Sequence, residues 1–155
     1  MGQPPERDCE GLAWQRGIWD RYPEIYRHEV DRRFAPVVEQ VITRAALQPG
    51  QHVLDLGTGT GSVALQAASL IGPCGEVLGV DISPEMLAVA HQRATAVGLT
   101  NVRFREGRAE TIPAEEGHFH VVLASLSLMY AIDRAAAARE IARVLQPGGR
   151  LVAAV

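Results

Sequence analysis

The stretch VLDLGTGTG, residues 53–61, decides the fold. Its apolar start is typical of a buried strand, carries one aspartate, and ends in a loop with glycine at every second position. A helix is expected from about Gly61 to Ile71, where Gly72 ends it. Glycines let a backbone turn sharply and approach a ligand closely, and free amides at a helix N-terminus attract a negative group. The stretch therefore predicts a strand, a turn and a helix that together leave room for a ligand.

Strand and helix signals alternate along the rest of the chain. Ser83 suits the N-cap of a second helix, Pro84 its first position and Gly98 its end. Asp133 suits the N-cap of an alanine-rich helix that reaches Leu145, after which QPGG breaks the chain before the last strand. Further strands are expected at EVLGVD (76–81), NVRFRE (101–106), HFHVVLA (118–124) and RLVAAV (150–155). The predicted fold is α/β, a Rossmann-like doubly wound and mostly parallel sheet with helices on both faces.

The first part of the chain mixes aromatic and charged residues. Pro23 and Pro36 each suit the first turn of a helix, so two short helices are expected before residue 48. We interpret residues 1–47 as an N-terminal helical segment that caps the site, and residues 48–155 as the ligand-binding domain. Trp19, Tyr22 and Tyr26 either form a lid or pack their helix onto the sheet, and packing is the preferred interpretation.

Two aspartates strengthen the case for a ligand at the glycine loop. Asp81 ends the second strand twenty residues after Gly61, the position from which a carboxylate binds both hydroxyls of a ribose. Asp55 lies inside the apolar first strand, where an unpaired carboxylate is costly unless a cationic or hydrogen-bonding group meets it. An amino group of the ligand would do so.

Five segments follow one another along the chain: VLDLGTGTG, VLGVDISPEML, VRFREGRAETIP, FHVVLASLSLMY and REIARVLQPGGRLV. Together they resemble a class I S-adenosylmethionine-dependent methyltransferase, and most closely the branch of quinone-biosynthesis and other small-molecule methyltransferases. The resemblance covers about residues 19–155, and it implies S-adenosyl-L-methionine as cofactor and a small molecule as methyl acceptor.

The resemblance also implies a role for particular residues. The methionine end of the cofactor would be held by Asp55, Gly57, Thr58, Gly59 and Gly61, the ribose by Asp81, and the adenine between Ile82 and Met86. Ser125, Ser127 and Tyr130 would face the methyl group, although no catalytic residue is assigned, because an activated methyl group requires alignment more than an acid or base.

Two positions depart from the family pattern. Arg108 stands where relatives often carry an acid that meets the adenine amino group, and a guanidinium cannot accept that hydrogen bond. Arg108 would instead stack on the adenine or pair with Glu110, leaving the backbone near Ala109 to contact the base. His120, at the amino end of the fourth strand, also replaces an acid, and we expect it to be structural.

Composition excludes several classes of function. The chain of 155 residues has a net charge of −3 and contains no lysine, so neither a nucleic-acid surface nor a Walker A phosphate loop is expected. Its apolar runs are too short for membrane insertion. Neither the histidines nor Cys9 and Cys74 have the spacing of a metal site or a disulfide framework, so we expect no metal and a cytoplasmic location.

Two alternatives stay open at this point. Gly59 to Ala64 also reads G-x-G-x-x-A, which suits an NAD(P)-binding oxidoreductase, although Asp55 would repel a pyrophosphate. The chain also stops as its fifth strand forms, whereas relatives usually add two antiparallel strands. It is therefore either an enzyme or a truncated, non-catalytic S-adenosylmethionine-binding domain, and the exposed edge of the fifth strand favours a homodimer.

Overall fold

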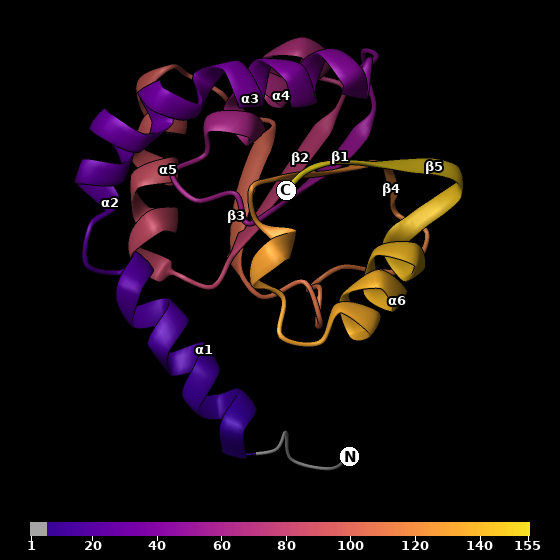
Figure 1. The fold of residues 1–155 in the computed structure, drawn as a ribbon. Coiled ribbons are helices and arrows are strands. Elements are labelled where there is room, and N and C mark those ends of the chain that lie inside the picture. Colours follow the sequence, from indigo (N-terminus) through magenta and orange to yellow (C-terminus); the bar gives the residue numbers. More distant parts are fainter. Residues whose placement is uncertain (1–5) are drawn as a thin grey trace.

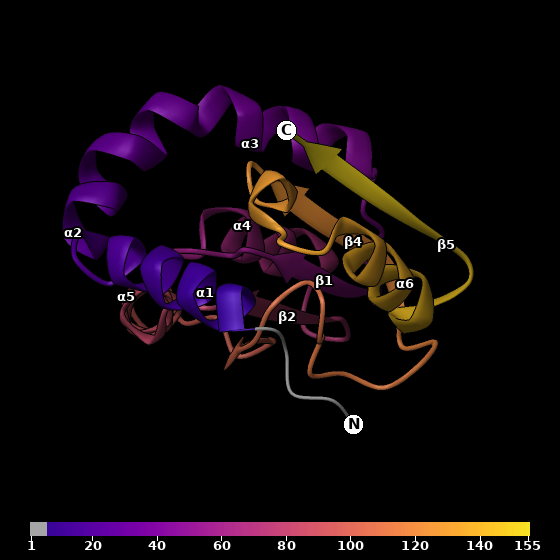
Figure 2. The same ribbon diagram turned by 60° about the horizontal axis from the view of Figure 1, so that its bottom comes forward.

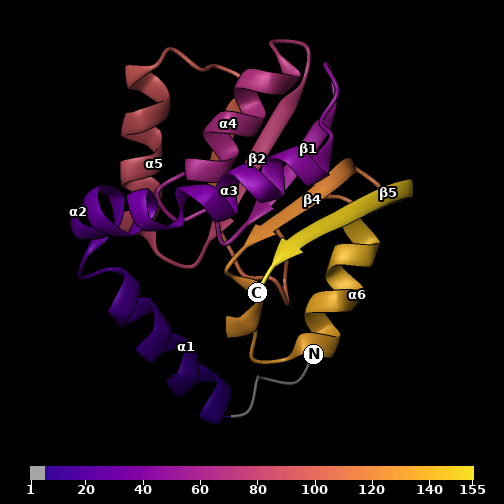
Figure 3. The same ribbon diagram turned by 45° about the horizontal axis from the view of Figure 1, so that its top comes forward.

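A computed structural model describes residues 6–155, with side chains from residue 10 onward. The first residues of the N-terminal segment and the Cys9 side chain therefore lie outside the described part. A five-stranded parallel sheet, in the order β3-β2-β1-β4-β5, forms the centre of the molecule (Figures 1 and 3). The strands are β1 (His52–Leu56), β2 (Glu76–Asp81), β3 (Val102–Glu106), β4 (Phe119–Ser125) and β5 (Leu145–Ala154). The α/β fold with a parallel sheet is confirmed.

The helices that follow the strands begin where the sequence predicts. They are α4 (Ser62–Ile71), α5 (Pro84–Ala96) and α6 (Arg134–Val144), with a short 3₁₀ turn, η2, at Leu128–Tyr130. The Ser83 hydroxyl accepts a hydrogen bond from the Met86 amide at 3.1 Å, and the Asp133 carboxylate accepts one from Ala136 at 2.9 Å. Both predicted N-caps are confirmed, and each satisfies an amide that the first helical turn leaves unpaired.

The N-terminal segment is more helical than predicted. It comprises α1 (Glu6–Trp19), α2 (Pro23–Ile25), a π-helical turn η1 (Tyr26–Val30) and α3 (Asp31–Ala45). Pro36 lies inside α3 and not at the start of a helix, so that prediction was wrong. An interior proline removes a backbone hydrogen bond, but Val38, Val41 and Ala45 bury the apolar stripe of α3 against the sheet, and this burial offsets the loss.

Each face of the sheet carries its own apolar core. Val53, Val77 and Val121 point to the face covered by α3, α4 and α5, whereas Leu54 and Val122 point to the face covered by α6. Figure 2 shows α3 and α6 on opposite sides of the strands. The alternation of inward positions follows from the two-residue period of a strand, and helices on both faces make the sheet doubly wound, as predicted.

The last strand differs from the sequence prediction. β5 begins at Leu145, directly after α6, and its register against β4 shifts between Phe119 and Val121. The QPGG residues are thus an irregular part of β5 and not a break before it. Gly148 permits this path because its φ is +80°, in the left-handed region. β5 pairs with β4 and forms an edge of the described sheet, with Leu151 exposed.

In the described residues, no helix combines the length and the apolar character that a membrane span requires.

Candidate functional site

A cavity of about 810 Å³, including its open mouth, lies at the carboxyl ends of the central strands. In open α/β sheets this edge is where ligands bind, beside the point at which the strand order reverses. Here the reversal lies between β1 and β4. The residues around the cavity are Leu12, Gln15, Trp19, Tyr26, Leu56, Gly57, Gly59, Val80, Asp81, Ile82, Met86, Gly107, Arg108, Ala109, Glu110, Ser125, Leu126, Ser127, Leu128, Tyr130 and Ala131.

Most of the residues that the sequence singles out meet at this cavity. Those that line it are Gly57, Gly59, Asp81, Ile82, Met86, Arg108, Ala109 and Ser125, together with Ser127 and Tyr130. Asp55, Thr58 and Gly61 are not in its wall. They lie in and beneath the glycine loop, where Asp55 and Thr58 are buried.

The three glycines of the loop serve different purposes. All have positive φ values, +68° at Gly57, +53° at Gly59 and +87° at Gly61. A Cβ on Gly57 would lie 2.2 Å from Ser127 Cβ, whereas one on Gly59 would meet only a carbon of Tyr26, at 4.0 Å. At Gly61 the space is occupied by Ala90 of α5. Only Gly59 therefore has open space beside it, and the expectation that all three positions leave room for a ligand was too broad.

The Asp81 carboxylate connects β2 to the glycine loop. It accepts a hydrogen bond from the Gly59 amide at 2.8 Å and one from the Ser83 amide at 3.0 Å. Burial raises the pKa of Asp81, and these backbone bonds partly offset the rise. Each carboxylate oxygen has two lone pairs, so Asp81 keeps acceptor capacity toward the cavity.

Asp55 and Thr58 form an unsatisfied polar pair beneath the loop. Asp55 is 1% exposed, and neither its Oδ2 atom nor the Thr58 hydroxyl oxygen has a hydrogen-bond partner. Burial raises the pKa of Asp55 to about 7, although the neighbouring Thr58 side chain lowers it in part. A buried polar atom without a partner is rare and costly, so this pair marks a position that a nearby cation or donor would stabilise.

Arg108 pairs with Glu110 on the opposite wall. Its Nε atom lies 3.0 Å from Glu110 Oε2, and the other oxygen of Glu110 accepts from the Ile132 amide at 2.8 Å. Burial raises the pKa of Glu110, but Arg108 and the backbone amides outweigh it, so the pKa is lowered overall. Of the two interpretations left open for Arg108, pairing is the one present, and Ala109 keeps its place in the cavity wall.

Residues 47–154 match the model of a protein family described as a methyltransferase domain. The chain belongs to this methyltransferase family.

Known relatives agree with the family assignment. The ubiquinone/menaquinone biosynthesis C-methyltransferase UbiE of Ectopseudomonas mendocina is 37% identical over 81% of this chain and 47% of its own length. The structure of the YcgJ protein of Bacillus subtilis is 34% identical, with a TM-score of 0.69 over 76% of this chain and 49% of that chain. A SAM-dependent methyltransferase of Aquifex aeolicus is 25% identical, with a TM-score of 0.69 over 74% and 61%. The chain spans about half the length of the curated relative.

Aromatic residues close one side of the cavity in this methyltransferase domain. The ring of Trp19 meets Tyr26 and Tyr130 edge to face, with centroids 5.9 and 5.4 Å apart. Burial, with Asp31 and Asp81 nearby, raises the pKa of Tyr26 to about 12, so its hydroxyl stays neutral. Trp19 and Tyr26 line the cavity, which favours the lid interpretation for these two residues, whereas Tyr22 is 54% exposed and is not part of the cavity wall.

Sequence reasoning missed part of the wall. Leu12 and Gln15 line the cavity from α1, and Gln15 Nε2 donates to the Tyr130 carbonyl at 3.0 Å. Leu126 lines it with a φ of +55°, an uncommon value for a residue with a side chain. No sequence pattern marks these three positions, because the path of the chain after β4 and the angle of α1 bring them there.

Proposed function

We propose that this protein transfers a methyl group from S-adenosyl-L-methionine to a small-molecule acceptor in the cavity at the carboxyl edge of the sheet. The observation that carries the proposal is the juxtaposition of Asp81 with the open position beside Gly59, in a chain of the methyltransferase family. The SAM-dependent methyltransferase of Aquifex aeolicus, which has the same fold, supports the choice of cofactor.

The residues present fit this cofactor. S-adenosylmethionine brings an activated methyl group on a sulfonium centre, an ammonium, a carboxylate, a ribose and an adenine, but no phosphate. The free acceptor capacity of Asp81 suits ribose hydroxyls, and the open position at Gly59 lets the ligand approach the backbone. The unpartnered Asp55 Oδ2 beneath the loop suits a cation above it, since a nearby positive charge favours the ionised carboxylate.

The roles we propose follow from these positions. Gly57 and Gly59 contact the methionine end, with Asp55, Thr58 and Gly61 shaping the loop and its potential from below. Asp81 binds the ribose, Ile82 and Met86 enclose the adenine, and the backbone at Ala109 contacts the base edge. Arg108 covers the base while paired with Glu110. Residues 48–155 form the cofactor domain, and the described part of the N-terminal segment, up to residue 47, closes it.

The acceptor would occupy the side of the cavity between Ser125 and the aromatic residues. We propose that Trp19, Tyr26 and Tyr130, whose rings meet edge to face, limit the access of water from this side. Exclusion of water and fixed alignment are the main requirements for displacing a methyl group from a sulfonium. The UbiE similarity supports a small-molecule acceptor. We assign no general acid or base among the cavity residues.

Calorimetric titration of the chain with S-adenosylmethionine tests the proposal. Asp81→Ala should weaken binding about tenfold or more, since a hydrogen bond to a charged group contributes about 1.5 to 3 kcal/mol. Glu76→Ala is the matched control, because Glu76 stands at the opposite end of the same strand. Equal affinities of the two variants would remove Asp81 from the site.

The same titration with NAD tests the oxidoreductase alternative, which the family assignment does not support. Binding of NAD and not of S-adenosylmethionine would overturn the proposal. Binding of S-adenosylmethionine without methylation of any acceptor would instead favour the non-catalytic binding domain.

We also propose that β5 pairs with its counterpart in a second copy. The support is its position at a sheet edge with Leu151 exposed. Light scattering that gives the mass of one chain would refute it.

A cytoplasmic location is likewise a proposal, supported by the exposed free thiol of Cys74, which suits a reducing compartment. Cell fractionation tests it.

A further inference from the structure

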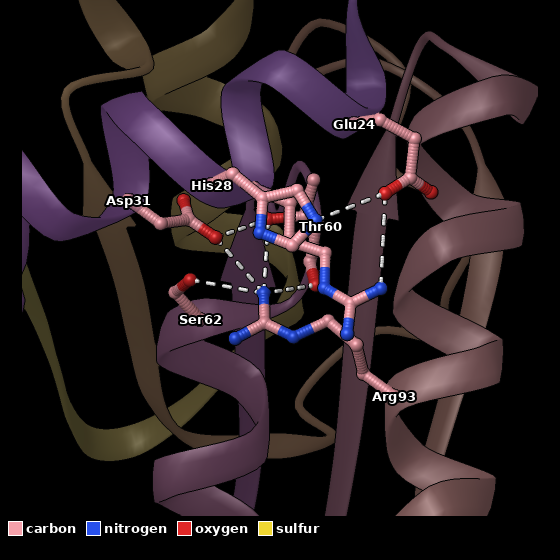
Figure 4. A network of polar contacts seen from close by, with 7 residues as sticks. Glu24, His28, Asp31, Thr60, Ser62 and Arg93 are labelled. Carbon is pink, nitrogen blue, oxygen red and sulfur yellow. Dashed lines mark hydrogen bonds and ion pairs between the residues drawn. The ribbon is translucent and has the colours of Figure 1, made fainter.

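A cluster of polar side chains outside the cavity wall joins the N-terminal segment to the glycine loop. Arg93 Nη1 lies 2.9 Å from Asp31 Oδ2, 2.8 Å from the Thr60 carbonyl oxygen and 3.0 Å from the Thr60 hydroxyl. It is also 3.2 Å from the Ser62 hydroxyl, and the Thr60 hydroxyl donates to Asp31 at 2.6 Å. Figure 4 shows these contacts converging on the Arg93 guanidinium.

The cluster connects three parts of the chain that are far apart in sequence. Asp31 begins α3, Thr60 lies in the glycine loop, and Arg93 belongs to α5. Asp31 is 14% exposed and Arg93 24%, so water screens the pair less than it screens an exposed pair. Removing one member of such a pair leaves the other poorly compensated.

Thr60 holds the loop at its centre, between Gly59 and Gly61. The Gly59 amide is bound by Asp81 on the cavity side, and Thr60 is bound by Asp31 and Arg93 on the other side. The flanking glycines, Gly59 and Gly61, have positive φ values. Without contacts that fix the loop, both glycines would also adopt other backbone conformations. The backbone that the cofactor approaches is therefore fixed from both sides.

The π-helical turn connects this cluster to the cavity wall. The Asp31 amide bonds to the Tyr26 carbonyl, five residues earlier. Such a bond brings residues five apart to nearly the same face, as a spacing of four does in an α-helix. Asp31 thus reaches Thr60 while Tyr26 reaches the open side of Gly59, where its ring is the nearest group. π-Helical turns are common at functional sites.

We propose that Asp31 and Arg93 are positioning residues that couple the glycine loop to the aromatic wall formed by Trp19, Tyr26 and Tyr130. Breaking the Asp31–Arg93 contact releases Thr60 from the outer side and Tyr26 from its place over Gly59 together. Cofactor affinity and closure of the wall then fall as one event. The part of this inference that concerns affinity rests on the proposed function, whereas the coupling itself does not.

Tryptophan fluorescence can report the wall without any ligand. The chain has two tryptophans, and Trp14 is 69% exposed, so Trp14→Phe leaves Trp19 as the sole reporter beside Tyr26 and Tyr130. In this background, Arg93→Met removes the guanidinium but keeps much of the apolar side chain. Glu24→Gln is the matched control, because Glu24 is an exposed carboxylate of the same segment that contacts only Arg27 and His28 in the described ion pairs.

We expect Arg93→Met to shift Trp19 emission to longer wavelength, to increase its quenching by acrylamide, and to weaken S-adenosylmethionine binding about tenfold. Glu24→Gln should change neither measurement. If Arg93→Met does not fold cooperatively, Asp31→Asn replaces it, since the amide keeps the shape and one acceptor for Thr60 but loses the charge. We expect the same three changes at smaller amplitude.

The outcomes separate the two claims. Unchanged Trp19 emission in the arginine and aspartate variants overturns the coupling, and so does weaker cofactor binding with an undisturbed Trp19. A purely structural ion pair would lower the midpoint of thermal unfolding and leave the emission of the folded chain unchanged. If the unsubstituted chain binds no S-adenosylmethionine while Arg93→Met still shifts Trp19, the proposed function fails and the coupling stands.

Discussion

Both ends of the sheet carry polar side chains, but they differ in whether the polar atoms have interaction partners. At the amino end, the His52 amide donates to His120 Nδ1 at 2.9 Å, and the ring of His118 stacks on His52 with centroids 4.9 Å apart. At the carboxyl end, Asp55 Oδ2 and the Thr58 hydroxyl lack partners, and a cavity opens beside them. The amino end pairs these polar groups with one another, whereas the carboxyl end leaves buried polar atoms unpaired beneath the glycine loop that borders the cavity.

This difference shows why polar residues at strand ends do not all indicate function. His52 contacts both His118 and His120, and no group of three or more potential ligands in the described residues is arranged to hold a metal ion. Asp55 and Asp81 have raised pKa values because burial penalises their charged forms.

The largest expected effect is at the carboxyl end, in the glycine loop. Gly57→Ala should lower the free energy of unfolding by about 4 kcal/mol or more, because its Cβ would overlap Ser127 and its φ is +68°. Gly98→Ala is the control, since Gly98 has a φ of +70° but no atom within 4 Å, and it should cost about 1 kcal/mol. Urea unfolding measures both, and equal losses would show that the close approach of Ser127 is unimportant.

The next effect concerns the unsatisfied carboxyl group. Burial raises the pKa of Asp55 in the folded chain from its ordinary value of 3.8 to about 7, so the unfolded chain loses this proton first as the pH rises. Stability from Asp55 is therefore present at low pH and is lost between about pH 4 and 7. Relative to Asp55→Asn, the unsubstituted chain should lose about 2 to 4 kcal/mol of unfolding free energy over this range.

The free energies of unfolding of the unsubstituted chain and Asp55→Asn are compared at each pH, so the contributions of Glu110 and Glu140 cancel. These contributions change with pH in the direction opposite to that of Asp55. Their pKa values are lowered, so their stabilisation is lost as the pH falls. A constant difference between the chains from pH 4 to 8 would mean that Asp55 is ionised and satisfied in the folded protein. S-adenosylmethionine should reduce the pH dependence if its ammonium lies above Asp55.

The smallest effect is expected at the satisfied end. His120→Ala leaves the His52 amide without its acceptor, which should lower the free energy of unfolding by about 1 kcal/mol. Cofactor affinity should stay within about twofold, because His120 lies at the opposite end of β4 from Ser125. Thermal unfolding and calorimetry measure the two quantities. A large loss of affinity would contradict the separation of the two ends.

The sequence predicts the α/β core well because its signals are local. Ser83 and Asp133 cap helices through hydrogen bonds that span three residues, and the apolar runs fit strands buried on both faces. Prediction fails where distant contacts outweigh local preference. Pro36 lies inside α3 because that helix buries an apolar stripe, and β5 starts early because it pairs with Phe119 of β4.

Some residues of the candidate site can likewise be predicted from local sequence spacing, whereas others are placed by distant contacts. The loop glycines and Asp81 can be found from spacing, because a strand, a turn and a helix place them within a short stretch of chain. The contribution of α1 and the contact between Arg93 and Thr60 cannot, because they join segments that are separated in the chain by whole helices and strands. Arg108 and Glu110 are an intermediate case, since they are close in sequence and their pairing was one of two interpretations.

By itself, the sequence determined the parallel sheet, the glycine loop and the carboxylate at the end of β2, since each depends on residue types at short, fixed spacing. Tertiary structure alone decided which loop glycine faces open space, which aromatic residues close the cavity, and that Asp55 lies beneath the loop without a partner for Oδ2. The physical reason is that burial and hydrogen-bond satisfaction depend on every segment packed around an atom, including those far away in the chain.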